Sequence, residues 1–186
     1  MPLSRRRVGV VSLLALGLAL SGCASSDAKP KPSALQGADP VAWVGLFCGG
    51  LGDVIAGAST IPKTPPTPQG QKDGLLNLAD VTQQAFSNTA QKLTQLGQPR
   101  ITNGKQVQAT TVGFFTTAAA TVGSQRAKVA ALDVKDPNFS QKANSLASPD
   151  LSAAGTQIQG LTSNKDLAPA FAKAPECQQL GAGAAH

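Results

Sequence analysis

The segment that decides the fold runs from residue 41 to residue 59 and reads VAWVGLFCGGLGDVIAGAS. Its apolar side chains recur three or four residues apart, as on one face of an α-helix, and Trp43 and Phe47 widen that face. Asp39 and Pro40 precede it, and these residue types cap a helix start and fit the first helical position. We therefore predict a helix here, the most buried one of the protein. Its apolar face comprises Val41, Val44, Cys48, Leu51 and Ile55.

A stripe of small residues runs along the same predicted helix. An internal glycine costs about 1 kcal/mol of helix stability relative to alanine, so a favourable contact must offset it. We predict that a neighbouring backbone packs closely against the stripe, and a ligand groove beside it is the alternative. We place the single tryptophan, Trp43, in the core rather than against a ligand. The stripe consists of Gly45, Gly49, Gly52 and Ala56.

Two further segments, residues 75–96 and 107–132, have the apolar spacing of helices that pack into a bundle. Gly97 and Pro99 end the first segment, and the second is entered near Asn103. Between these helices and the first one, the chain reads IPKTPPTPQG from residue 61 to residue 70. So many prolines exclude a helix there. We favour a stiff loop, and O-linked sugar on its threonines is the alternative.

The last third of the chain carries several helix signals. Asp136 and Pro137 start a helix, Ser148 and Pro149 restart it, and a short helix is expected within residues 164–174. Strand signals are weak, since tyrosine is absent and aromatic residues are few. We predict an all-α fold: an up-down bundle of about four helices, whose last arm is broken near Pro149.

The N-terminus has the order of an export signal. Three arginines precede an apolar run over residues 8–20, followed by the small residues Ser21 and Gly22 and then by Cys23. The run is shorter than the roughly 20 apolar residues that a membrane-spanning helix needs. The arginines also offer a twin-arginine pair, although the residues after them match weakly, so we favour a plain basic start.

The stretch Leu20-Ser21-Gly22-Cys23 resembles the lipobox of bacterial lipoproteins. In that family the cysteine sulfur carries a diacylglyceryl group, and the signal is cut just before the cysteine. The resemblance implies that residues 1–22 are a signal peptide and that Cys23 is the acylated N-terminus. Two acyl chains suffice for stable membrane anchoring. The alternative is an ordinary secretory signal with an incidental cysteine.

The remaining chain divides into a tether, a domain and a tail. Residues 23–38 begin with the acylated cysteine and continue as a polar stretch without periodicity, which spans about 20 Å as a flexible coil. We expect a helical domain over residues 39–178 and a disordered Gly/Ala-rich tail over residues 179–186. Without the signal, 13 basic and 10 acidic residues remain, a mild excess that does not favour nucleic-acid binding.

If Cys23 is acylated, two cysteines remain. Export places Cys48 and Cys177 in an oxidising compartment, where such pairs persist as disulfides. We predict a Cys48–Cys177 bridge, and two buried free thiols are the alternative. Closing a loop of this length stabilises a fold by about 5 kcal/mol on chain-entropy grounds.

The sequence offers little for catalysis. The only histidine, His186, is the last residue, so histidine-based triads lack a base. The acidic residues are scattered, Glu176 is the sole glutamate, and no cysteine is left for zinc, so we predict neither a metal nor a cofactor. Asp53 would need a second carboxylate nearby to act as a catalytic acid, and we expect it to face solvent or cap a helix. We therefore predict no catalytic residues and no enzyme.

The lipobox, Cys48 in the first helix and the ending LAPAFAKAPEC at residues 167–177 together look like small lipoproteins of the actinobacterial cell envelope. This resemblance implies a membrane address and a helical shape, but no activity and no functional residue beyond Cys23. We expect a non-catalytic, exported protein that is anchored to the cell membrane or envelope and binds or scaffolds a protein partner. The alternative is a carrier of a small apolar or lipid ligand between helices. The pattern names no ligand-binding residues.

Overall fold

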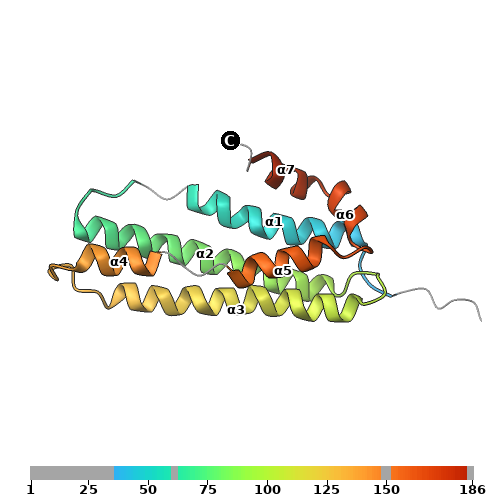
Figure 1. The fold of residues 1–186 in the computed structure, drawn as a ribbon, viewed down its shortest axis with the longest axis horizontal. Helices are drawn as coiled ribbons and strands as arrows, with labels where there is room; N and C mark the ends of the chain where they lie inside the picture. Colours follow the sequence, from blue (N-terminus) through green and yellow to red (C-terminus); the bar gives the residue numbers. More distant parts are fainter. Residues whose placement is uncertain (1–35, 60–62, 148–151, 184–186) are drawn as a thin grey trace, which may run out of the picture. The chain divides into compact units, whose positions relative to one another are not determined.

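The computed structural model describes residues 36–59, 63–147 and 152–183. Within them the chain forms helices and no strand, so the all-α prediction is confirmed. Three long helices are followed by four short ones, rather than by one broken arm (Figure 1). The predicted signal peptide, Cys23, Pro149 and His186 lie outside the described residues. The helices are α1 (Pro40–Ser59), α2 (Pro68–Leu96), α3 (Gly104–Ala130), α4 (Phe139–Ala147), α5 (Ser152–Thr162), α6 (Ala168–Lys173) and α7 (Pro175–Gly183).

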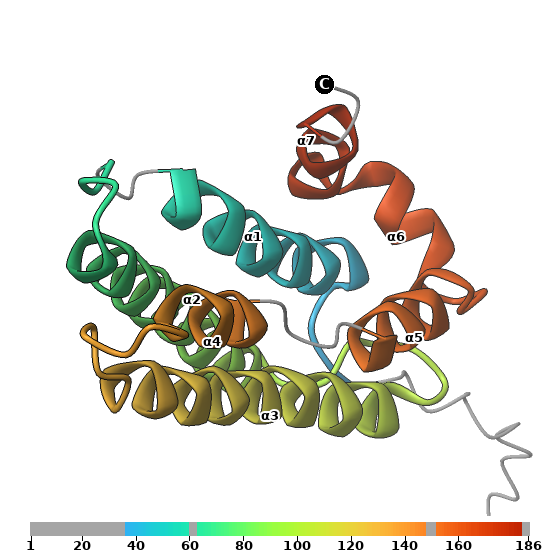
Figure 2. The ribbon, with the colours of Figure 1, turned by 60° about the vertical axis from the view of Figure 1, so that its left-hand side comes forward.

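The long helices α1, α2 and α3 form the body of the domain. Helix α2 packs along both α1 and α3, which lie on either side of it (Figure 2). Side chains from all three helices fill the space between them, and Phe47 meets Phe115 edge to face with ring centroids 5.8 Å apart. Such pairs contribute beyond the burial of their area. The largest fully buried side chains of the body are Trp43, Phe47, Phe115 and Leu93.

Helix α1 supplies much of this core, but only from its first half. Trp43 and Phe47 are buried, as expected, whereas Ile55 is 63% exposed, so its predicted place on the buried face was wrong. The reason is that the short C-terminal helices cover only part of α1. By length and composition alone α1 would suit a membrane span, a property that core helices of soluble proteins share.

The small-residue stripe of α1 packs against α7. A Cβ added at Gly45 would lie 2.7 Å from Glu176 Oε2, and one at Gly52 would lie 3.8 Å from the Leu180 side chain. The close approach at the stripe is therefore made by side chains of α7. Gly50 allows a similarly close approach between α1 and α2, because an added Cβ there would lie 2.3 Å from the Thr89 side chain.

Helix α2 starts inside the proline-rich segment, earlier than predicted. Thr67 caps it by accepting a hydrogen bond from the Gly70 N–H at 3.1 Å, and Pro68 occupies the first turn, where a missing N–H is harmless. The exclusion of helix from residues 61–70 was therefore wrong at its end. The Thr67 hydroxyl is already engaged as the cap, which argues against a sugar at that position.

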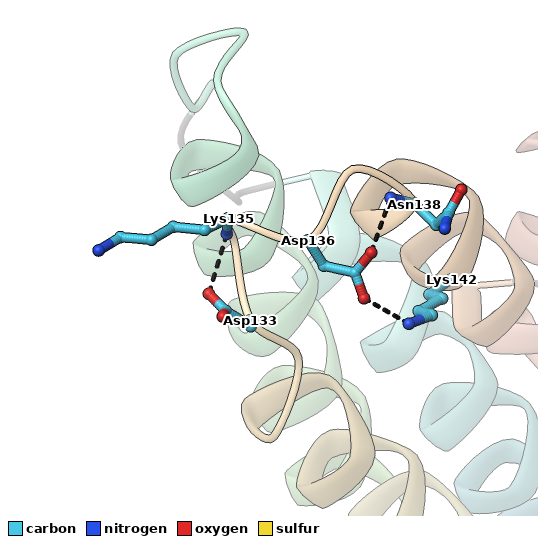
Figure 3. Close-up of polar contacts among 5 residues, drawn as sticks. All are labelled: Asp133, Lys135, Asp136, Asn138 and Lys142. Atoms are coloured by element: carbon cyan, nitrogen blue, oxygen red, sulfur yellow. Dashed lines mark hydrogen bonds and ion pairs between the residues drawn. The ribbon is translucent and has the colours of Figure 1, made fainter.

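The corner between α3 and α4 is held by polar groups. Lys72 Nζ donates to the carbonyl oxygens of Ala130 and Leu132, both at 2.7 Å, which satisfies the end of α3. Asp136 accepts hydrogen bonds from the Asn138 N–H and from Lys142 (Figure 3). Helix α4 follows this turn, slightly later than the start expected at Asp136 and Pro137.

The C-terminal arm, residues 152–183, returns from α3 to α1. Helix α5 contacts α3, while α6 and α7 contact α1. The predicted bridge is present: Cys48 and Cys177 are disulfide-bonded with Cα atoms 5.0 Å apart. Helix α7 continues to Gly183, so the expected start of a disordered tail at residue 179 was wrong.

Candidate functional site

A cleft of about 600 Å³ lies between the first two turns of α3 and helix α5. Val107 and Leu161 contribute aliphatic surface, and Gly160 leaves space on the α5 side. The other lining side chains are all amides or hydroxyls: Asn103, Gln106, Thr110, Thr156, Gln157 and Asn164. The volume lies within the range of small-molecule and peptide sites.

The loop over residues 97–103 positions the α3 side of the cleft. Gly97 adopts φ +81°, which favours glycine and lets the chain leave α2 sharply. Pro99 is fully buried, and its carbonyl oxygen lies so close to Gly104 that an added Cβ there would be 2.1 Å away. Asn103 makes no capping hydrogen bond with its side chain. Its amide therefore lies at the cleft without serving the helix start.

A half-buried hydrogen-bond network fixes the same turns of α3 to the other two long helices. Trp43 Nε1 donates to Gln108 Oε1 at 2.6 Å, and Gln108 Nε2 donates to the Leu93 carbonyl oxygen at 2.6 Å. One glutamine side chain thus joins all three helices of the body. Trp43 is a core residue, as predicted. Because Gln108 follows Val107, the network also holds the cleft wall in place.

On the opposite wall, the turn after α5 orients Asn164. Its Oδ1 accepts the Asp166 N–H at 2.9 Å, and Leu167, which is fully buried, anchors the next turn. Leu161 is buried in the main core as well. The α5 wall is therefore attached to the core through Leu161, which also lines the cleft, and through Leu167.

The chemistry of the cleft suits binding rather than reaction. None of its described lining side chains ionises in the physiological range, so none of these can act as a general acid, a general base or an activated nucleophile. Amides and hydroxyls both donate and accept hydrogen bonds. A cleft with four amides can therefore pair with any neutral group that does the same, such as a peptide bond.

A second groove of about 450 Å³ brings Asp53 and Glu176 together beside the glycine stripe. The sequence could not pair these residues, because they come from α1 and α7. Asp53 forms an ion pair with Lys92 at 3.9 Å, and both side chains are 59% exposed. The expected solvent-facing position of Asp53 agrees with this exposure. Surface pairs of this kind contribute little and are screened by salt, so we do not assign catalysis to the groove.

The most apolar groove is lined by Leu75, Leu78, Val122 and Leu146, among others, where α2, α3 and α4 meet. Its volume is about 130 Å³, well below the roughly 300 Å³ at which ligand pockets usually begin. It offers little room for an acyl chain.

Two surface ion pairs have shifted pKa values. The hydrogen bond to Asp80, reinforced by its charge, raises the pKa of Arg126 above its ordinary value. The hydrogen bond from Lys142, followed by that from the Asn138 N–H, lowers the pKa of Asp136. Neither pair lines the polar cleft. Within the described ranges, no three His, Cys, Asp or Glu side chains lie together as metal ligands.

The residues of the cleft were missed by sequence reasoning. Asn103 was noted only as a helix start, and Gln106, Thr110 and Gln157 look like the solvent face of an amphipathic helix. The Cys48–Cys177 pair was predicted correctly, because these are the two cysteines that remain once Cys23 is taken as the acylation site. No family model, curated protein or solved structure matches this chain.

Proposed function

We propose that this protein is a non-catalytic, exported lipoprotein of the cell envelope that binds a protein partner in the cleft between α3 and α5. The observation that carries the proposal is the lining of the cleft. Its amides and hydroxyls match the hydrogen-bonding groups of a polypeptide, and its described lining residues include no ionisable side chain.

The proposed address comes from the N-terminal sequence. The lipobox-like Leu20-Ser21-Gly22-Cys23 supports removal of residues 1–22 and acylation of Cys23. Two acyl chains would hold the folded domain at the membrane surface. The disulfide between Cys48 and Cys177 agrees with an oxidising compartment outside the cytoplasm.

The alternative of a small apolar or lipid ligand has less support. A lipid carrier needs an apolar space long enough for an acyl chain. Most described residues that line the larger cleft carry amides or hydroxyls, and the apolar groove between α2, α3 and α4 is small. An enzyme reading would rest on Asp53 and Glu176, and the exposed ion pair of Asp53 with Lys92 argues against it.

Site-specific photo-crosslinking in intact membranes tests the proposal. A photoreactive residue at Thr110, inside the cleft, should give a protein adduct. The same residue at Thr121 is the matched control, because both threonines are exposed on α3 but only Thr110 lines the cleft. Equal adducts from both positions, or adducts to lipid alone from Thr110, would contradict the proposal.

A blocking substitution adds a second test. Gly160→Leu places a side chain into the cleft from α5, where an added Cβ meets nothing within 4 Å. The Thr110 adduct should fall at least tenfold, because the new side chain fills the space in which the partner binds. Gly181→Leu on α7 is the control, because that position is equally open but lies outside the cleft. An undiminished adduct in Gly160→Leu would place the partner elsewhere.

A further inference from the structure

We infer that the partner in the cleft is an uncharged, extended segment of an integral membrane protein, presented close to the bilayer surface. This inference rests on the proposed function and deepens it. It follows from two features of the described residues: the point at which the N-terminal chain joins the domain, and the chemistry of the cleft lining.

The N-terminal chain joins the domain on the same loop that begins the cleft. The Ala38 N–H donates to the Gln98 carbonyl oxygen at 2.8 Å, and the Arg100 N–H donates to the Ala38 carbonyl oxygen at 2.9 Å. Gln98 Nε2 also donates to the Gln36 carbonyl oxygen at 2.9 Å. These bonds form a parallel bridge between Ala38 and Pro99. The chain is therefore tied to residues 97–103 immediately before α1 begins.

We call these contacts of residues 36–38 with Gln98 and Arg100 the clamp, and Gly37 is the residue that makes them possible. It adopts φ +146°, and an added Cβ would lie 2.4 Å from the Gln98 carbonyl oxygen. Only glycine lets the two backbones approach so closely. Asp39 adds an ion pair with Arg100 at 3.8 Å, and its Oδ1 accepts the Val41 N–H at 2.9 Å. The direction in which the chain reaches the domain is thus set by several independent contacts.

The clamp and the cleft are close because one short loop carries both. Arg100 and Asn103 are three residues apart, so their Cα atoms are separated by at most about 11 Å. Asn103 lines the cleft. The cleft therefore lies at the end of the domain to which the proposed anchor is attached, and not at the far end of the three long helices.

The length of the proposed tether limits the height of the cleft above the membrane. Residues 23–35 are 13 residues. A flexible chain of that length spans about 20 Å, and a fully extended one spans about 45 Å. A partner segment in the cleft must lie within the same distance of the bilayer. Extracytoplasmic loops of membrane proteins meet this condition at all times, whereas a soluble partner would have to be recruited.

The lining selects an uncharged and extended segment. The described lining residues offer four amides and two hydroxyls but no charged group, so a charged side chain would find no counter-ion among them for its lost hydration. Val107 and Leu161 can receive one small apolar side chain. The described lining residues include no aromatic ring that could serve as a platform for a sugar. A main chain, with one N–H and one carbonyl per residue, matches the amides best.

Crosslinking from Gln106 in membranes, combined with changes in tether length, tests the inference. In one variant about twenty Gly/Ser residues are inserted between Cys23 and Leu35. The layer above the membrane that the domain explores thickens with roughly the square root of tether length, so the local concentration of the cleft, and with it the adduct, should fall about 1.6-fold. The control replaces residues 24–35 by Gly/Ser without changing the length, and its adduct should equal that of the native chain.

The outcomes separate the inference from the proposed function. An adduct to an integral membrane protein, mapped by mass spectrometry to an uncharged peptide and weakened in the lengthened variant only, supports the inference. An adduct to a soluble protein whose yield ignores tether length overturns it and leaves the proposed function standing. An adduct to a charged peptide, or to the protein's own residues 24–35, also overturns it. Absence of any protein adduct refutes the proposed function itself.

Discussion

The three-helix body and the C-terminal arm are held together by different means. In the body, α2 packs along both neighbours, and large side chains such as Phe47 and Phe115 are fully buried. In the arm, α5, α6 and α7 have 11, 6 and 9 residues, and helices shorter than about 12 residues are marginal in water. The arm depends on a few buried residues, including Leu167, and on the Cys48–Cys177 bridge.

This difference matters because the cleft takes one wall from each region. The α3 wall is fixed by the body and its glutamine network, and the α5 wall by the arm. A change in the body should therefore affect the whole fold, while a change in the arm should affect the cleft first.

The largest effect is expected from the body. Phe115→Ala removes a fully buried ring that contacts Phe47 and Phe86, and should lower the free energy of unfolding by about 3–5 kcal/mol. Denaturant unfolding of the mature chain measures this loss. A loss below about 1 kcal/mol would mean that the body core is not packed around Phe115.

The next effect separates the arm from the body. Replacing both Cys48 and Cys177 by serine should cost about 2–5 kcal/mol, since the bridge closes a loop with a sequence separation of 129. Amide hydrogen exchange should rise first in α6 and α7, while α2 and α3 stay protected. Uniform loss of protection across all helices would remove the distinction between the two regions.

Two neighbouring polar residues of α3, the half-buried Gln108 and the buried Thr111, provide the next comparison. Gln108→Leu leaves the Trp43 N–H unpaired and should cost about 1–3 kcal/mol. Thr111→Val, one turn further along α3, removes a buried hydroxyl that has no hydrogen-bond partner, and should be neutral or stabilising by about 1 kcal/mol. Thermal melts of both variants check the contrast. Similar losses in the two would show that Gln108 contributes only packing.

A glycine pair tests how closely α1 and α2 pack. Gly50→Ala forces a methyl group against the buried Thr89 and should cost about 1–3 kcal/mol. Gly113→Ala on α3 meets nothing within 4 Å and should stabilise by about 0.5–1 kcal/mol through helix propensity. Urea midpoints of the two variants should shift in opposite directions. A stabilised Gly50→Ala would mean that α1 and α2 have room between them.

The smallest effect concerns the corner between α3 and α4. Because the folded state lowers the pKa of Asp136, this residue stabilises the fold above about pH 4, the ordinary pKa of an aspartate. The contribution is lost as the pH falls through the lower, folded-state pKa. Asp136→Asn should slightly reduce the loss of stability between about pH 4 and lower pH. Asp133→Asn serves as control, because the described contacts of Asp133 include the Lys135 backbone N–H but no ion pair with a lysine ammonium. An unchanged loss of stability in Asp136→Asn would show that the pair with Lys142 does not form in solution.

Part of this structure was accessible from sequence because it depends on local rules. Periodicity identified α1, α2 and α3, Asn103 was recognised near the start of α3, and the short helix within residues 164–174 is α6. The start of α2 was placed too late, because proline was treated as an excluded residue when it is acceptable in a first turn. The exposure of Ile55 was missed because periodicity shows which side chains share one face of a helix, but not how much of that face other helices cover.

What the sequence by itself determined is the helical class, the apolar faces of the long helices and the pairing of Cys48 with Cys177. These follow from residue spacing and from the even number of cysteines left after Cys23. Neither requires knowing which residues are neighbours in space. Only the tertiary structure decided which polar residues converge. Asn103 and Asn164 line one cleft, and the proposed anchor joins the domain beside it, because the arm folds back across α3. A polar helix face has the same pattern whether it meets water or another helix, so its partner is set by the path of the chain.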